Sequence, residues 1–314
     1  MVTLERPRPA RQAAPRFRLA FLVDNPAWLG PLMIGPAVLY IALVVGVPFF
    51  LALYYSVSDV TAGDRTLDFV GLQNFASVVT TTKFQTALRN TFVFAISAQV
   101  AVMVLGTVLA LALLHEFRGK WLVRLLILLP WVAPISLGTI GWLWILDSTY
   151  SVLNWTLEAL GFVGEYGGFM WLGIPHLAMG SVVTIHVWRI LPLATVILLA
   201  GLSSIPKDIH DAAAVDGAGF LRHFFQITLP LIRPIMLVAG LFGLVFAFTD
   251  MIVIFVLTRG GPYDTTQVLS SLAFFTGIQG GDLAEGAAIA VFLFPLLLAV
   301  AIAFLRVARR AEVT

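Results

Sequence analysis

Two charged residues, Arg189 and Asp250, lie inside long apolar stretches of the sequence. A charge within a membrane-spanning segment is costly, and residues of this kind are candidates for function. Arg189 lies about 13 residues from the outer end of its stretch and Asp250 about 7 from that of its own, which at ~1.5 Å per residue places them roughly 20 Å and 10 Å deep. This difference predicts no direct ion pair, unless a helix is broken, as Pro192 would allow.

The other polar residues form no arrangement that is typical of catalysis or metal binding. His176 and His186 are ten residues apart and do not make a metal pair. The chain has no nucleophile–base set, no paired carboxylates at catalytic spacing within a span, and no Gly-x-x-x-x-Gly-Lys-Ser/Thr motif that would cradle phosphates. Cysteine is absent, which excludes disulfides and thiol chemistry. The sequence predicts a non-enzymatic chain with no metal site or cofactor of its own.

The composition places the chain among membrane proteins. Of 314 residues, 60% are hydrophobic and 11% are charged, whereas a soluble domain carries about a quarter charged residues. The net charge of +2 gives no electrostatic support for binding nucleic acid. A spanning helix needs about 20 apolar residues. The predicted spans are Ile34–Tyr55, Asn90–Leu114, Leu125–Leu146, His176–Ala200, Pro234–Leu257 and Ala287–Leu305. The predicted fold is an all-α polytopic membrane protein with six transmembrane helices and one domain over residues 1–314.

Lysine and arginine are distributed unevenly between the two sides. The N-terminal tail, the segments Glu116–Arg124 and Ile205–Arg233, and the C-terminal tail hold fourteen of the nineteen, and the opposite loops hold four. Cytoplasmic loops carry this excess, so both termini are predicted to be cytoplasmic. The basic tail over residues 1–28 is not a signal peptide, because the apolar stretch after it is too long.

The outer loops carry structure of their own. Tyr150–Leu160 is predicted to be a short helix lying at the membrane interface. The last outer loop opens with Arg259-Gly260-Gly261-Pro262, a strong turn signal. Gln267–Phe275, further along, is apolar enough to dip back toward the membrane. Span three contains Pro130 and Pro134 and is predicted to be broken in character.

The segment 205–233 between spans four and five predicts two short helices joined by a turn. Pro206 suits a first helical position, and Asp208 favours the positive end of the helix dipole. The alanines after it are strong helix formers with little bulk, and Gly217 permits a turn that would strain other residues. A short helix with a small-residue surface can enter a cleft on a partner protein, and an acidic side chain beside it can pair with a partner cation. A plain connector between spans is the alternative.

The whole segment resembles the permease signature of bacterial ATP-binding-cassette importers, Glu-Ala-Ala-x-x-Asp-Gly-Ala followed by a Phe and Ile-x-Leu-Pro-x-x-x-Pro. The matching residues are Asp211, Ala212, Ala213, Asp216, Gly217, Ala218, Phe224, Ile227, Leu229, Pro230 and Pro234. Asp211 departs from the usual glutamate and keeps the charge with a shorter reach. Leu257-Thr258-Arg259-Gly260-Gly261-Pro262 is also similar to the end of span five in carbohydrate permeases of the maltose-permease (MalF-like) type. The resemblance covers roughly Trp188 to the end of the chain.

The resemblance implies the type I importer fold and a sugar-translocating permease of the bacterial cell membrane. The implied partners are a second related permease, two ATPase subunits that bind the ATP and Mg²⁺, and an extracytoplasmic solute-binding protein. The implied ATPase-docking residues, on the coupling helix and after it, are Asp211, Ala212, Ala213, Asp216, Gly217, Ala218 and Phe224. The candidate pathway residues are Asp250, Arg189, Trp188 and Thr249.

Several alternatives stay open. The cargo could be a polyol or a glycerol phosphate, although a phosphate favours more cations in the spans than Arg189 alone. An ion-coupled secondary transporter is the alternative of another class. Asp250 could accept a sugar hydroxyl or a structural hydrogen bond from Thr249 or a loop amide. Arg189 could instead support a broken helix or line an inner gate. Trp142 and Trp144 could stack on sugars or form an interfacial aromatic belt.

Overall fold

The computed structural model describes residues 26–64, 67–164 and 168–312, with side chains described from 29 to 307 within these ranges. The predicted basic tail over 1–28 lies outside the described residues except for 26–28. The chain separates into two compact units, Met1–Leu51 and Ala52–Thr314. The first unit contains helix α2 (Pro26–Ile41), a π-helical segment η1 (Ala42–Gly46) and the start of α3 (Val47–Ser56). The exposed side chains of this span are almost all apolar, as expected of a helix whose whole surface meets an apolar environment.

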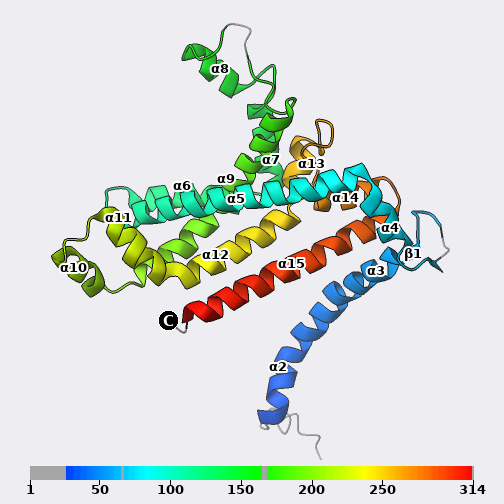
Figure 1. The fold of residues 1–314 in the computed structure, drawn as a ribbon, viewed down its shortest axis with the longest axis horizontal. Helices are drawn as coiled ribbons and strands as arrows, with labels where there is room; N and C mark the ends of the chain where they lie inside the picture. The colour runs from blue at the N-terminus through cyan, green and yellow to red at the C-terminus, as the bar shows by residue number, and fades with distance from the viewer. Residues whose placement is uncertain (1–25, 65–66, 165–167, 313–314) are drawn as a thin grey trace, which may run out of the picture. The chain divides into compact units, whose positions relative to one another are not determined.

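Four long helices form the body of the second unit, as Figure 1 shows. They are α5 (Thr82–Leu114), α9 (Pro175–Ser203), α12 (Leu229–Thr249) and α15 (Leu283–Glu312). Helix α5 begins where the Thr81 hydroxyl accepts a hydrogen bond from the Phe84 amide at 3.2 Å, which satisfies one of the free N–H groups of the first turn. Helix α5 packs along α9, and α12 contacts α5, α9 and α15. This order brings α9 and α12, which carry the candidate pathway residues, side by side.

The third span is bent. Helices α6 (Lys120–Val132) and α7 (Ile135–Ile145) meet at 98°, with Ala133 and Pro134 between them. Pro134 has no N–H to donate, and proline disfavours helical geometry at the residue before it, so the helix ends there. Pro130 lies inside α6 without ending it. The break predicted from these prolines is confirmed, at the second of them.

Within the described residues, five helical segments are long and apolar enough to cross a membrane, and the bent pair α6–α7 provides a sixth. The six predicted spans are therefore confirmed in number and order. Their ends differ by several residues, mostly because polar turns extend the helices beyond the apolar windows, whereas the fifth ends eight residues before the predicted Leu257. The observed segments are Leu29–Ser56, Thr82–Leu114, Lys120–Ile145, Pro175–Ser203, Phe220–Thr249 and Leu283–Val307.

Short elements gather at the two ends of the second unit (Figure 1). One end carries α10 (Lys207–Val215), α11 (Phe220–His223) and the π-helical segment η2 (Phe224–Thr228). The other end carries an antiparallel pair of strands, β1 (Ser58–Asp59) and β2 (Asp68–Phe69), and helices α4 (Gln73–Thr80), α13 (Ile252–Leu257) and α14 (Leu269–Phe274), the last continued by η3 (Phe275–Gln279). The segment predicted to dip back forms α14, whose Leu269 and Leu272 are buried. The short helix predicted over Tyr150–Leu160 is observed as α8 (Val152–Ala159), where Trp155 is exposed.

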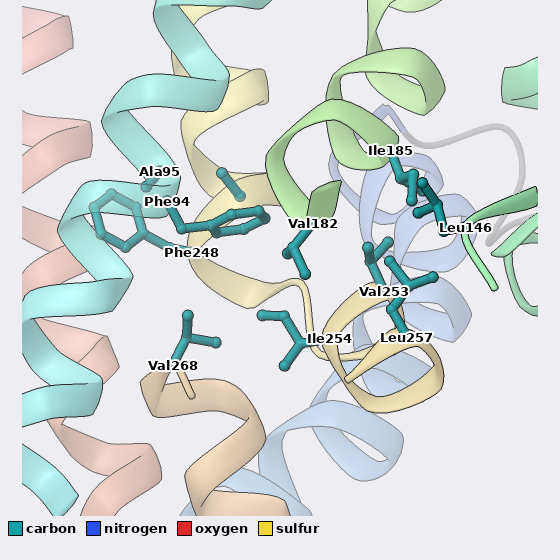
Figure 2. Packing of buried hydrophobic residues seen from close by; sticks show 11 residues of the cluster. Phe94, Ala95, Leu146, Val182, Ile185, Phe248, Val253, Ile254, Leu257 and Val268 are labelled. Atoms are coloured by element: carbon teal, nitrogen blue, oxygen red, sulfur yellow. The ribbon is translucent and has the colours of Figure 1, made fainter. Parts of the chain in front are cut away.

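The main buried core lies where α5, α7, α9, α12 and α13 converge. Figure 2 shows side chains of α5, α9, α12 and α13 meeting there, together with Leu146, which follows α7, and Val268, which precedes α14. Phe94 of α5 lies among Val182 and Ile185 of α9 and Ile254 of α13, and all four are almost fully buried. Because densely packed interiors resist deformation, this core holds α9 and the end of α12 in fixed register.

Glycines let α12 approach α5 closely. A Cβ at Gly243 would collide with the amide group of Gln99, a buried residue whose Nε2 has no hydrogen-bond partner among the described atoms. We expect Gly243→Ala to lower the free energy of unfolding of the purified protein by about 1 kcal/mol, the low end of the effect of overpacking, because the atoms that the Cβ meets lie at the end of the Gln99 side chain. Gly141→Ala is the matched control, because a Cβ there meets nothing within 4 Å. Equal melting temperatures for the two variants would contradict this interpretation.

Candidate functional site

The fifth span is broken at Asp250. Helix α12 ends at Thr249, Asp250 is extended (φ −71°, ψ 110°), and α13 begins at Ile252. A break inside a membrane frees backbone groups that must find other partners. Here the Asp250 carboxylate accepts the Val253 amide at 3.3 Å, and the Ser270 hydroxyl of α14 donates to the Asp250 carbonyl at 3.0 Å. The side chain of Asp250 therefore satisfies an N–H of the first turn of α13. Ser270 of α14 satisfies a backbone carbonyl at the break.

Asp250 forms a direct ion pair with Arg189. The Arg189 guanidinium donates to Oδ2 of Asp250 at 2.9 Å, and the side chains are 17% and 1% exposed. The prediction of no direct ion pair was wrong. It treated span five as one helix ending at Leu257, whereas α12 ends at Thr249, so Asp250 lies at a helix end rather than seven residues inside one. The break that allows the pair is at Asp250 and not at Pro192, which lies inside an unbroken α9.

His186 completes the cluster and was not predicted. Its Nδ1 lies 2.6 Å from Oδ2 of Asp250, and both side chains are 1% exposed. An ionised carboxylate only accepts hydrogen bonds, so Nδ1 carries the proton and donates. His186 lies three residues before Arg189, which places both on one face of α9. The spacing of three residues between His186 and Arg189 is the feature of the sequence that indicates the cluster. The spacing between His186 and His176 does not.

The cluster is balanced in charge when His186 is neutral. Arg189 contributes one positive charge that is not lost in proteins, and Asp250 contributes one negative charge. A buried charge without its partner costs several kcal/mol, so the residues depend on one another. We will call His186, Arg189 and Asp250 the break cluster.

A cavity of about 490 Å³ opens beside the break cluster. Arg189, Thr249, Asp250 and Ser270 give its wall a polar side, and the rest is apolar, including Phe246 and Leu293. The volume lies within the range of small-molecule sites. The Nε of Arg189 is buried and has no partner among the described atoms. The cavity is therefore lined by an arginine that is partly exposed and held in place by a carboxylate.

The four candidate pathway residues do not all meet at this cavity. Asp250, Arg189 and Thr249 line it, although the Thr249 hydroxyl bonds to the Val245 carbonyl at 2.8 Å and not to Asp250. Trp188 does not line it. Its ring packs edge-on against Trp142 of α7, with ring centres 5.6 Å apart, and covers Gly138. Of the two candidate belt residues, Trp144 is 67% exposed, whereas Trp142 is only partly exposed.

The loop between spans four and five forms the two predicted helices, α10 and α11. Helix α10 begins after Pro206, which caps it rather than occupying its first turn, and Gly217 turns the chain with a φ of +70°. In this loop Asp211, Ala212, Asp216 and Gly217 are exposed, Ala218 and Phe224 are half-buried, and Ala213 is buried. Val215 at the end of α10 is 87% exposed. This end of the molecule thus presents small, acidic and apolar side chains together.

The turn after α13 is unusually constrained. Arg259, Tyr263 and Asp264 all have positive φ, and Tyr263 is 92% exposed. The hydroxyls of Thr258 and Thr266 lie 2.7 Å apart, and Asn90 of α5 donates to the carbonyls of Asp264 and Gln267, both at 3.1 Å. The turn predicted at Gly260-Gly261-Pro262 is confirmed. Searched over the described residues, the chain has no group of three or more metal-ligating side chains.

Comparison with known proteins identifies the family. Residues 102–313 match the family described as "Binding-protein-dependent transport system inner membrane component". The chain belongs to this family. Its arrangement is the type I importer fold: a bacterial transporter for the acidic polysaccharide alginate, solved with its alginate-pentasaccharide-bound periplasmic protein, superposes with a TM-score of 0.78 at 20% identity over 93% of this chain and 98% of that one.

Two curated relatives of this permease are similar over nearly their whole length. One is the trehalose/maltose transport system permease protein MalF of Thermococcus litoralis, 33% identical over 90% of this chain and 94% of the relative. Another is the sn-glycerol-3-phosphate transport system permease protein UgpA of Yersinia pseudotuberculosis, 31% identical over 90% of this chain and 95% of the relative. The chain is thus the multi-pass membrane permease of an ATP-binding-cassette importer. The ion-coupled alternative is not favoured.

Proposed function

We propose that this permease forms the translocation pathway for a neutral saccharide and that the cavity beside the break cluster is where the cargo passes. The observation that carries the proposal is the combination in that cavity of a charge-balanced ion pair, Arg189 with Asp250, and a largely apolar wall. Sugar hydroxyls both donate and accept hydrogen bonds. Arg189 would donate to them, the Asp250 carboxylate would hold the guanidinium in place, and the apolar wall suits the C–H faces of a sugar ring.

The charge balance favours a neutral cargo over a glycerol phosphate. A phosphate brings negative charge and is bound in proteins by cations with capacity to spare. Arg189 is already paired with Asp250 at 2.9 Å, and its charge is the only one that the described cavity lining offers besides that carboxylate. An anionic cargo would enter this site without a compensating charge. The trehalose/maltose relative is consistent with a neutral cargo, and the glycerol-phosphate relative supplies the alternative cargo to be tested.

The proposed assembly contains a second related permease, two ATPase subunits and an extracytoplasmic solute-binding protein. ATP and Mg²⁺ bind in the ATPase subunits. Both termini and the basic tail over 1–28 lie in the cytoplasm of a bacterial cell, as the arginine and lysine distribution favours. The whole chain acts as one membrane domain. The exposed acidic and apolar side chains of α10 support docking of an ATPase subunit at the loop 205–233.

Transport by alternating access would follow from rigid-body motion. ATP binding draws the two ATPase subunits together, α10 moves with the subunit that it contacts, and the packed spans exchange between two arrangements. The break at Asp250 gives span five a place where its two halves can change angle. The break cluster holds α9 to this break, so motion of the spans would alter the cavity.

Reconstitution of the complete importer in proteoliposomes tests the proposal. With the solute-binding protein outside and ATP inside, we expect accumulation of a radiolabelled neutral saccharide such as trehalose or maltose, and none of labelled sn-glycerol 3-phosphate. A complex with catalytically inactive ATPase subunits is the control and should accumulate nothing. Uptake of glycerol 3-phosphate but of no neutral saccharide would contradict the proposed cargo. Uptake driven by an ion gradient without ATP would contradict the proposed mechanism.

A further inference from the structure

Two histidines meet across the turn of the loop between spans four and five. Nδ1 of His210, in the middle of α10, lies 3.0 Å from Nε2 of His223, at the end of α11. The rings are 4.9 Å apart and inclined by 33°. Nδ1 of His223 in turn lies 3.3 Å from the hydroxyl of Thr228, a residue that is 3% exposed at the end of η2. A chain of hydrogen bonds therefore leads from α10 to the first residues of span five.

This chain of hydrogen bonds is a specific attachment of α10 to the start of span five. Among the side chains that the structure describes, no other hydrogen bond or ion pair joins α10 to another helix. The connecting residues 216–219 include Gly217 and Gly219, and glycine restrains the backbone least. Apart from the packing of the buried Ala213, the peptide link alone would leave α10 free to change its angle relative to α11 and α12.

We infer that His210 and His223 are positioning residues that lock α10 to span five, so that movement of α10 is transmitted to the spans. The inference rests on the proposed function, because it takes α10 as the element that contacts the ATPase subunit. A helix that moves with its partner transmits displacement only when its attachment to the span is stiff. Without the hydrogen bond between His210 and His223, α10 would move with the ATPase subunit by bending the chain at Gly217, and less of that motion would reach the spans.

The hydrogen-bond chain works with neutral imidazoles in either direction. If His210 donates from Nδ1 to Nε2 of His223, then His223 carries its own proton on Nδ1 and donates to Thr228. If His223 donates instead, Thr228 donates to His223. Each imidazole has one donor and one acceptor when neutral, so each arrangement satisfies the three groups. Leucine fills a similar space at either position but can neither donate nor accept.

The first test measures attachment without transport. Hydrogen–deuterium exchange of the α10 amides is followed in the purified complex for wild type, His210→Leu and His210→Gln. We expect His210→Leu to raise exchange about 2- to 10-fold, the factor that corresponds to one net hydrogen bond, and His210→Gln to restore part of the protection. Lys83→Ala, at an exposed residue of α5 outside the loop 205–233, is the control and should not change exchange. Unchanged exchange in His210→Leu would overturn the lock.

The second test measures coupling in proteoliposomes as ATP hydrolysed per saccharide imported. We expect His210→Leu and His223→Leu each to raise this ratio about 2- to 10-fold while the complex stays assembled, and the double variant to equal the singles, since both remove one interaction. Additive effects, or an unchanged ratio, would overturn the inference. Failure of the proposed function looks different, because the wild-type complex would then import no saccharide although its α10 exchange could still depend on His210.

Discussion

Asp250→Leu is expected to abolish import and to destabilise the purified complex. The substitution leaves the Arg189 guanidinium, 17% exposed, and the buried His186 ring without the carboxylate that both contact. Breaking a buried ion pair by removing one partner costs about 3–5 kcal/mol. It also removes the cap of α13, whose Val253 amide bonds to that carboxylate. Thermal unfolding of the detergent-solubilised complex and ATP-driven saccharide uptake measure the two effects.

The double variant Arg189→Met/Asp250→Leu separates stability from transport. A buried ion pair replaced by apolar residues of similar volume is often neutral in stability. We therefore expect the double variant to recover part of the lost melting temperature, since His186 and the Val253 amide still lack the carboxylate, and to import nothing, because neither polar group remains at the cavity. Asp68→Asn, an exposed acidic residue in β2, serves as the control. Normal uptake by a stable double variant would remove the break cluster from the pathway and leave it a purely structural role.

The break cluster also shows how far the sequence could predict this site. Charges within apolar stretches pointed to Arg189 and Asp250, and both line the same cavity. The ion pair could not be predicted, because hydropathy treats Pro234–Leu257 as one continuous span. At the break the Asp250 carbonyl accepts a hydrogen bond at 3.0 Å from Ser270, twenty residues further on. Such a contact between distant residues has no local signature.

Helix geometry explains the remaining differences at the site. Trp188 and Arg189 are neighbours in the sequence, but successive residues of an α-helix point about 100° apart, at 3.6 residues per turn. Trp188 consequently packs on α7 while Arg189 faces the cavity. His186, three residues before Arg189, lies on the same face of the helix. The helical period therefore predicts which residues join Arg189 at the site, and adjacency in the sequence does not. Pro192 did not break α9, since packing against α5 and α12 holds the helix together on both sides of it.

Features set by local chemistry were predictable. The break at Pro134, the turn at Gly260-Gly261-Pro262 and the two helices around Gly217 each follow from residues that restrict or free the backbone. The six spans follow from the length of their apolar stretches. The ends of the spans do not follow from these stretches, because polar turns such as the one capped by Thr81 extend a helix past the apolar window.

Asp211→Arg is expected to abolish association with the ATPase subunit while leaving the permease folded. Asp211 is exposed on α10 and has no hydrogen bond or ion pair among the described side chains, so its replacement disturbs no contact within the chain. A charge reversal at a desolvated contact costs several kcal/mol through like-charge juxtaposition, which corresponds to at least a hundredfold loss of affinity. Asp211→Glu, which restores the residue usual in the family's signature, should bind at least as well as wild type. Co-purification of the ATPase subunit with tagged permease, followed by ATPase assay, measures both.

Gly217 provides a matched pair for the same surface. Its φ of +70° is a left-handed conformation, which costs other residues roughly 1–2 kcal/mol but is tolerated best by asparagine. Gly217→Val should therefore displace the end of α10 and weaken co-purification, whereas Gly217→Asn should keep it. Both substitutions add a side chain at one exposed position. If the backbone conformation matters, only Gly217→Val should lose the ATPase subunit. If the added bulk at the interface matters, both variants should lose it. Full ATPase association of both Asp211→Arg and Gly217→Val would place the docking surface elsewhere on the permease.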